Sequence, residues 1–179
     1  MNKIEPIPFG SDYMIRETGV RNVSAVPPVT VDTGSCTARL FHNRKDDVLT
    51  ADVSSGTTIP VERIIPFKVG DLIYVMLNTG VWHDAGLLIS KSGTDLEVTN
   101  AIPSNARAGL RVAVKIGPDV AMPTYGTPVL GAFDWGYGGI IEPGHDGLVI
   151  GMEIRIETTI AADGARSVKN YKTQVIGGA

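Results

Sequence analysis

Cysteine is almost absent from this sequence of 179 residues, which contains only Cys36. A single cysteine cannot form a disulfide within the chain, and it cannot build a cysteine-based zinc site. Cys36 opens an alternating stretch that ends at Phe41, so we expect it to be a small buried residue in a strand. Crosslinks of either kind are therefore excluded as the basis of the fold.

Clusters of basic residues are also missing. The chain has 16 Lys and Arg residues against 19 Asp and Glu residues, and its net charge is -3. Its densest basic pair, Arg44-Lys45, is followed at once by Asp46-Asp47. Because nucleic-acid binding requires clustered cations to neutralise phosphates, we expect no nucleic-acid partner.

Long apolar runs are lacking as well. No stretch approaches the roughly 20 apolar residues that a membrane-spanning helix needs. The segment 1–10 contains Glu5, Pro6 and Pro8 and does not have the pattern of a signal peptide. We therefore expect no membrane partner, and a protein that is made and kept in the cytoplasm.

Histidine is scarce, with only His42, His83 and His145, and two of these are followed by Asp84 and Asp146. Both His-Asp pairs fall in expected strands or turns, where neighbouring side chains point to opposite faces and do not converge on one ion. Neither a Gly-x-Ser-x-Gly elbow nor a phosphate-binding Gly-rich loop occurs. The sequence therefore predicts no catalytic residue, no metal site and no cofactor, and we do not expect an enzyme.

Glycine and proline are plentiful, at 21 and 11 residues, which indicates many turns and few helices. Residues 67–116 repeat a pattern of short apolar strands separated by Gly-containing turns, which is typical of an antiparallel meander. The expected strands are Leu72–Leu77, Val81–Ser90, Leu96–Thr99 and Leu110–Ile116. We predict an all-β fold in which this meander forms a β-barrel or β-tulip-like module.

The rest of the chain divides by composition. We expect an extended N-terminal arm over 1–34 and a β-rich domain over 35–179. Within that domain, a loop region rich in Gly and aromatic residues over 117–147 follows the meander. A long hairpin over 148–176 turns at Asp163-Gly164, a strong hairpin signal. The charged residues 43–47 are predicted to form a turn between two short strands.

The arm is broken by prolines but carries much apolar surface. Its one candidate helix covers 12–18, capped by Ser11. An arm of this kind either packs on its own domain or docks on a neighbouring chain, and aromatic residues in Gly-rich loops are also frequent anchors. The candidate interface residues are Ile4, Ile7, Phe9, Tyr13, Ile15, Phe133, Trp135 and Tyr137.

Several motifs within 67–116 together resemble the small β-rich virion proteins of tailed bacteriophages, especially capsid decoration (cement) proteins with β-tulip or β-barrel domains. The motifs are Phe67-x-Val69-Gly70-Asp71-x-Ile73-x-Val75, Gly93-Thr94-x-Leu96-x-Val98, Ile102-Pro103-Ser104-Asn105-Ala106 and Gly109-x-Arg111-Val112. This resemblance implies a homo-oligomer, with a trimer favoured, that binds the major capsid protein. It also implies assembly in the host cytoplasm, a place on the capsid surface of the virion, and neither catalysis nor a cofactor.

Three alternatives remain open at this point, one of which is a small hydrolase, which would need a pocket that joins His83 or His145 to a carboxylate. Head–tail connectors, baseplate components and head fibres share the same pattern of motifs. A carbohydrate-binding β-sandwich is a different class, in which Trp82, Trp135 and Tyr137 would form the stacking platform. We expect Trp82 to be a core residue, whereas Trp135 fits loop packing and an interface equally well.

Overall fold

The computed structural model describes residues 2–10, 12–18, 21–22, 29–30, 35–125, 136–141, 147–162 and 165–177. The ordered elements in these ranges are all β-strands, which confirms the predicted all-β class. Within the same ranges, no helix is long and apolar enough to cross a membrane.

The chain forms two compact units. Unit 1 comprises Met1–Leu40 and Gly117–Ala179, and unit 2 comprises Phe41–Ile116. Both passages between the units fall within strands, namely β6 (Ser35–Val48) and β11 (Arg111–Ala121). The division therefore differs from the predicted one, because residues 1–34 belong to the same unit as the C-terminal hairpin.

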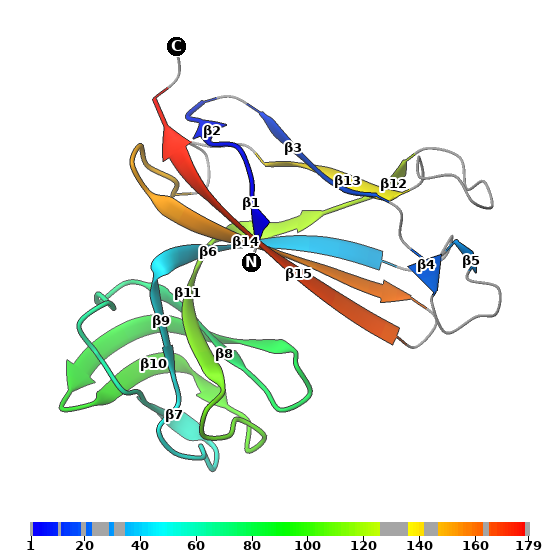
Figure 1. Ribbon diagram of the computed structural model, residues 1–179. Coiled ribbons are helices and arrows are strands. Elements are labelled where there is room, and N and C mark those ends of the chain that lie inside the picture. Colours follow the sequence, from blue (N-terminus) through cyan, green and yellow to red (C-terminus); the bar gives the residue numbers. More distant parts are fainter. Residues whose placement is uncertain are drawn as a thin grey trace. The chain divides into compact units, whose positions relative to one another are not determined.

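Unit 2 contains the predicted meander (Figure 1). Strand β8 (Leu72–Met76) pairs antiparallel with β11 on one side and with β9 (Trp82–Ser92) on the other. Strand β10 (Asp95–Ile102) pairs antiparallel with β9 and with β7 (Gly56–Pro60). The strand order in this unit is β6-β11-β8-β9-β10-β7, so β8 lies inside the sheet, as its apolar sequence indicates.

Closure of this sheet into a continuous barrel is not observed in the part of the chain that the structure describes, because the ladder order ends at β7. One isolated antiparallel bridge joins Leu49, just after β6, to Val61, just after β7. The backbone N–H of Thr50 also donates to the carbonyl of Pro60 at 3.1 Å. The two ends of the strand order therefore meet at a single bridge.

The core of unit 2 comes from alternate positions along its strands and from the loop before β8. Because side chains alternate across a pleated strand, every second residue of β8 is buried, whereas residues 112–116 of β11 are buried without alternation. The largest fully buried side chains of this core are Leu49, Ile59, Phe67, Ile73, Leu88, Leu96 and Ile102.

Strand β6 corrects the predicted charged turn over 43–47, since the strand runs unbroken to Val48. The charges of Lys45, Asp46 and Asp47 are compatible with a strand because each of the three lies within 4 Å of an opposite charge elsewhere in unit 2. Asp46 pairs with Arg111 at 2.6 Å, and Lys45 pairs with Asp71 at 2.7 Å. Local charge density indicated a turn, but tertiary ion pairs stabilise the extended form.

Unit 1 contains the predicted hairpin, formed by β14 (Glu153–Ala162) and β15 (Ala165–Ile176). Their register pairs Ala162 with Ala165, so only Asp163 and Gly164 separate the strands, and these two lie outside the described residues. Strand β6 lies beside β14 in the sheet order. Strands β1 (Asn2–Lys3) and β2 (Ile7–Pro8) add to β15 in parallel.

A second, small sheet in unit 1 has the order β12-β13-β3, with β12 at Thr124–Tyr125, β13 at Gly136–Ile141 and β3 at Tyr13–Thr18. A short pair formed by β4 (Arg21–Asn22) and β5 (Val29–Thr30) lies apart from both sheets in the strand order. Strand β13 occupies part of the region that the sequence assigned to a loop. The predicted helix over 12–18 is wrong, because Ile15 and Glu17 alternate inward against exposed neighbours, which is a strand pattern.

Candidate functional site

The described part of the arm packs against its own unit. Ile7 is fully buried where β2 pairs with β15, and Ile15 is buried on the inner face of β3. These two side chains already contribute to the core of unit 1, so the structure removes them from the candidate interface. Their apolar character reflects folding within the chain.

Three other candidates from the arm are half-buried. The backbone N–H of Ile4 donates to the Lys172 carbonyl at 3.1 Å, and that of Phe9 donates to the Ile176 carbonyl at 2.8 Å. Partial burial, and secondarily the charge of Glu5, raises the pKa of the Tyr13 hydroxyl. The side chains of these three residues remain partly exposed, but hydrogen bonds hold the backbones of Ile4 and Phe9 on unit 1.

The side chains of the remaining three predicted candidates lie outside the described part of the structure. Phe133 and Trp135 lie outside the described residues. Tyr137 belongs to β13 by its backbone, where it pairs with Glu17 of β3 and Thr124 of β12.

Exposed large apolar residues instead mark a surface of unit 2 that the sequence analysis missed. We call it the Ile65 surface, and it consists of Ile65, Val69, Leu87 and Ile89. Ile65 is 88% exposed, and the other three are exposed by about half or more. Leu87 and Ile89 are outward positions of β9 on either side of buried Leu88. Large exposed apolar side chains of this kind are candidates for contacts with a partner, because binding removes their apolar surface from water.

Backbone hydrogen bonds place the loop over 62–71 beside this part of β9. The N–H of Gly70 donates to the Leu88 carbonyl at 2.9 Å, and the N–H of Leu88 donates to the Asp71 carbonyl at 2.9 Å. Val69, next to Gly70, therefore lies alongside the strand that carries Leu87 and Ile89.

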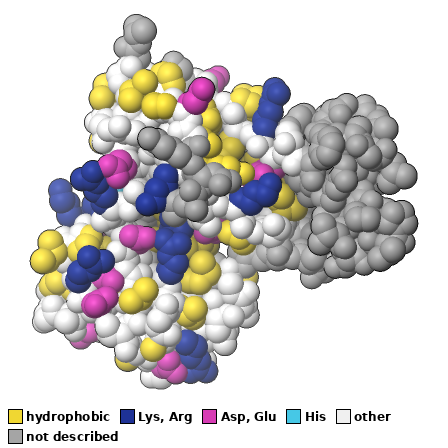
Figure 2. All heavy atoms as spheres, in the orientation of Figure 1, with side chains coloured by type: hydrophobic (Ala, Val, Ile, Leu, Met, Phe, Trp, Pro, Cys, Tyr) yellow, Lys and Arg dark blue, Asp and Glu magenta, His cyan; other side chains and the backbone are white. Residues whose placement is uncertain are grey.

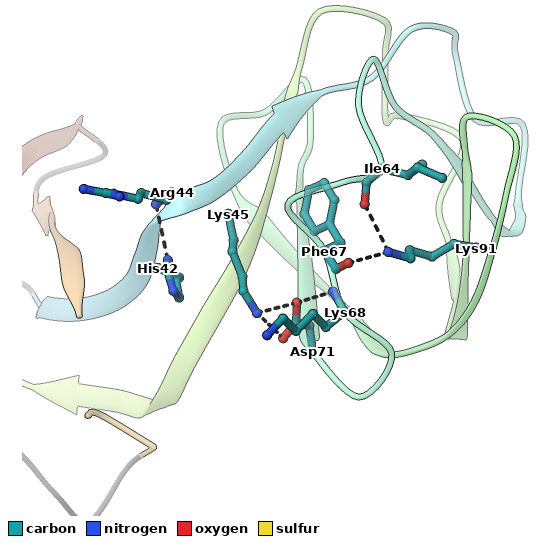
Figure 3. A network of polar contacts seen from close by, with 8 residues as sticks. All are labelled: His42, Arg44, Lys45, Ile64, Phe67, Lys68, Asp71 and Lys91. Carbon is teal, nitrogen blue, oxygen red and sulfur yellow. Dashed lines mark hydrogen bonds and ion pairs between the residues drawn. The ribbon is translucent and has the colours of Figure 1, made fainter. Parts of the chain in front are cut away.

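Polar contacts hold this loop in place, as Figure 3 shows. The carboxylate of Asp71 accepts the Lys68 N–H at 2.7 Å and the Lys45 ammonium at 2.7 and 2.9 Å. The Lys91 ammonium from β9 donates to the carbonyls of Phe67 at 2.7 Å and Ile64 at 3.4 Å. Phe67 itself is fully buried in the core. The loop is therefore attached to β6, to β9 and to the core.

A second carboxylate fixes the start of the same loop. Asp47 is buried, and its Oδ2 atom accepts the backbone N–H of Arg63 at 2.6 Å. The Arg63 guanidinium lies 3.7 Å from the same oxygen. With both ends held, Ile65 and Val69 remain exposed on a loop that has little freedom to fold them inward. Preorganisation of this kind lowers the entropic cost of binding.

The sequence does contain a signal for this surface. Ile64 and Ile65 are adjacent and precede Pro66, so alternation allows only one of the two isoleucines to face the core. Which of the two is exposed depends on tertiary contacts, so the sequence alone could not assign it.

A smaller exposed apolar group lies on unit 1, which we call the Ile150 surface: Val149, Ile150 and Ile176. The N–H of Gly151 donates to the Val175 carbonyl at 2.8 Å, which brings the turn before β14 to the end of β15. Phe9 adjoins it through its bond to Ile176. At this group a predicted arm residue, Phe9, meets an exposed apolar residue.

Unit 1 also contains a buried polar cluster around Glu17, which is 1% exposed. Its Oε1 atom accepts hydrogen bonds from the hydroxyls of Thr158 and, at 2.7 Å, Tyr171. Its Oε2 atom accepts from the Lys169 ammonium at 2.6 Å. Glu17 belongs to the small sheet, whereas its three partners belong to the hairpin, so the carboxylate links the two sheets.

The electrostatics of this cluster disfavour nucleophilic chemistry. Burial, and then the charge of Glu17, raises the pKa of the Cys36 thiol from 9.0 to about 12. Burial and the hydrogen bond to Glu17 likewise raise the pKa of the Tyr171 hydroxyl. An activated nucleophile requires the opposite shift. The geometry of the cluster is that of a structural link.

The described His-Asp pair does not converge, as predicted. The His83 Nε2 atom lies 3.0 Å from the Ala101 carbonyl oxygen, whereas the Asp84 carboxylate accepts from the Tyr74 hydroxyl and the Gly86 N–H. In the part of the chain that the structure describes, no group of three His, Cys, Asp or Glu residues could hold a metal ion. His145 and Asp146 lie outside that part.

Trp82 is 7% exposed, which confirms its predicted place in the core. Its ring centroid lies 4.7 Å from that of Phe41, with the planes tilted by 38°. A sugar-stacking platform requires an exposed ring face, so Trp82 does not serve as one in this structure.

Figure 2 shows Lys and Arg side chains scattered among Asp, Glu and hydrophobic side chains on one face of the described residues.

Comparison with protein-family models, curated proteins and solved structures finds no match for this chain.

Proposed function

We propose that this protein is a structural component of a tailed-bacteriophage virion, namely a decoration protein that binds the major capsid protein and stabilises the shell. The observation that carries the proposal is the Ile65 surface, in which four large apolar side chains are exposed on a firmly held loop and strand. The motif resemblance covers 67–116 and so falls entirely inside unit 2, which carries this surface.

The size of the apolar surface fits repeated, individually modest contacts. Burying one such side chain contributes about 1.5–3 kcal/mol before the costs of association are subtracted. A single copy is therefore expected to bind the shell weakly. A homo-oligomer, with a trimer favoured, binds the shell through several such contacts at once, and multivalency then adds their weak affinities. This mode of binding suits a shell that must resist internal pressure.

A carbohydrate-binding module remains the alternative from another class, but the burial of Trp82 leaves it only Trp135 and Tyr137, whose side chains are not described. A connector, baseplate or head-fibre role would use the same kind of apolar surface against a different virion partner. The exposed, preorganised apolar loop favours protein contacts over sugar contacts.

Adding the purified chain to capsids that lack it, followed by co-sedimentation, tests this proposal. We expect the chain to sediment with capsids at a fixed ratio to the major capsid protein. Sedimentation with isolated tails or necks, and none with capsids, would reject the decoration role and favour the connector. Retention on immobilised glycans without binding to any virion part would favour the carbohydrate-binding module.

A further inference from the structure

In unit 1, the buried carboxylate of Glu17 is paired with the half-exposed ammonium of Lys169. Replacing a buried ion pair by apolar residues of similar volume is often neutral or stabilising, because desolvation offsets the attraction between the charges. Glu17 and Lys169 therefore add little net stability over an apolar contact. Buried pairs of this kind are best known for fixing a register or for making a contact switchable.

The position of the pair indicates which contact it controls. Glu17 is the buried charged residue of β3, and β3 pairs along its length only with β13 within the described strands. Strands β1 and β2 of the arm pair with β15 through two register pairs each. The carboxylate thus makes the polar connection between β3 and the hairpin.

The two charges have unequal access to water. Glu17 is fully enclosed, whereas the Lys169 side chain is 43% exposed. If Lys169 were neutral, the carboxylate would remain buried with two hydroxyl donors but no cation, which is costly. If Glu17 were neutral, Lys169 could turn to water at little cost. The contact is therefore sensitive to the charge of the exposed partner.

We infer that Glu17 and Lys169 form a charge latch, in which the positive charge of Lys169 keeps the buried carboxylate of Glu17, and with it the N-terminal strand β3, on the C-terminal hairpin. Loss of the Lys169 charge alone lets β3 open without unfolding the hairpin or unit 2. Opening uncovers Ile15 and the inner face of the small sheet. The inference rests on the geometry of unit 1 alone and does not depend on the proposed function.

The single cysteine gives a direct reporter of this opening. Cys36 is buried, and its sulfur lies 3.5 Å from the Met122 sulfur. Met122 in turn lies against Gly139 of β13, so the thiol is close to the small sheet that contains β3. The rate at which an aromatic disulfide reagent labels Cys36 follows the population of the open state when opening and closing are fast. No other thiol contributes to the signal.

The experiment compares labelling rates at pH 8 in the full chain. We expect the Cys36 thiol of Lys169→Met to be labelled about tenfold faster than that of the original protein. The increase would be larger if Lys169 were fully buried, because solvent screens its interaction with Glu17. Glu17→Gln alone should raise the rate by no more than about twofold, because loss of the carboxylate charge lowers the pKa of the Cys36 thiol but does not open β3. The Glu17→Gln/Lys169→Met double variant should return the rate to within about twofold of the original protein, because an amide accepts the same hydroxyl bonds without a buried charge. Removing the positive charge of Lys169 by itself would slow labelling, so faster labelling reports opening.

Lys172→Met is the matched control, because Lys172 lies on the same strand but is exposed, and its labelling rate should not change. Hydrogen exchange of the β9 and β14 amides shows whether opening is local. An unchanged rate in Lys169→Met, or no restoration in the double variant, would overturn the latch. If hydrogen exchange of the β14 amides accelerates as much as the labelling of Cys36, unit 1 unfolds globally, and this result would overturn the latch as well.

Discussion

The Lys45 ammonium lies 2.7 and 2.9 Å from the two carboxylate oxygens of Asp71, and this ion pair joins strand β6 to the loop that exposes Ile65. Both side chains are largely buried, so the pair is shielded from solvent. The same carboxylate accepts the Lys68 N–H. Asp71 therefore fixes the end of the loop that exposes Ile65, as Asp47 fixes its start.

The first prediction concerns this ion pair. Asp71→Ala should lower the free energy of unfolding of unit 2 by about 1–3 kcal/mol, because it leaves a partly buried ammonium and a backbone N–H without their acceptor. Thermal or denaturant unfolding measures the effect. Arg107→Gln is the control, since its ion pair with Asp52 is about half exposed and should contribute little. Equal changes in the two variants would contradict the assigned role of Asp71.

The second prediction concerns the close approach between β9 and β10. Gly86 has a φ of +78°, and a Cβ atom there would lie 1.9 Å from the Thr99 hydroxyl oxygen. Gly86→Ala should therefore combine backbone strain with a steric clash and destabilise unit 2 by about 2–4 kcal/mol. Gly93→Ala provides the comparison, because its φ is +58° but its Cβ would meet nothing within 4 Å. Its cost should be about 1–2 kcal/mol, and a larger cost at Gly93 would contradict the packing described.

The third prediction concerns alkaline pH. The pKa values of Cys36 and Tyr171 are raised on folding, so the folded protein keeps both groups protonated where the unfolded chain ionises them. Their contribution to stability is fully present below pH 9 and is lost as the pH rises from about 9 toward 12. The thermal midpoint of unit 1 should therefore fall over this range, as followed by calorimetry. Cys36→Ala should reduce the slope, and an unchanged slope would contradict the assignment.

The fourth prediction concerns removal of the arm. Deleting residues 1–28 removes Ile7, Ile15 and Glu17 from unit 1 but leaves unit 2 intact. We expect the midpoint temperature of unfolding of unit 1 to fall markedly, whereas the hydrogen-exchange rates of the β8 and β9 amides should stay unchanged. If those amides lose protection, the two units do not fold independently.

The meander and the hairpin could be predicted from the sequence because their signals are local. Strands β8 to β11 are separated by Gly-containing turns, and the register at Ala162–Ala165 leaves the Asp-Gly pair between β14 and β15. Period-two alternation and turn chemistry need no knowledge of distant residues.

The remaining features depend on long-range contacts. Strand β6 continues through 43–47 because Lys45 and Asp46 pair with residues 26 and 65 positions away. Strand β3 replaces the expected helix because it pairs with β13, more than a hundred positions later in the sequence. The exposure of Ile65, and not Ile64, depends on the hydrogen bonds that hold the loop. Local sequence patterns do not encode these contacts.

Capsid co-sedimentation with charged variants of the two apolar surfaces tests the central claim most directly. Ile65→Asp should reduce occupancy on capsids that lack the protein at least tenfold, because it places a charge in the contact, while its exposed position leaves folding unchanged. Ile150→Asp, which changes an exposed apolar residue of unit 1, should bind at full occupancy. Full occupancy of a folded Ile65→Asp variant would contradict the account.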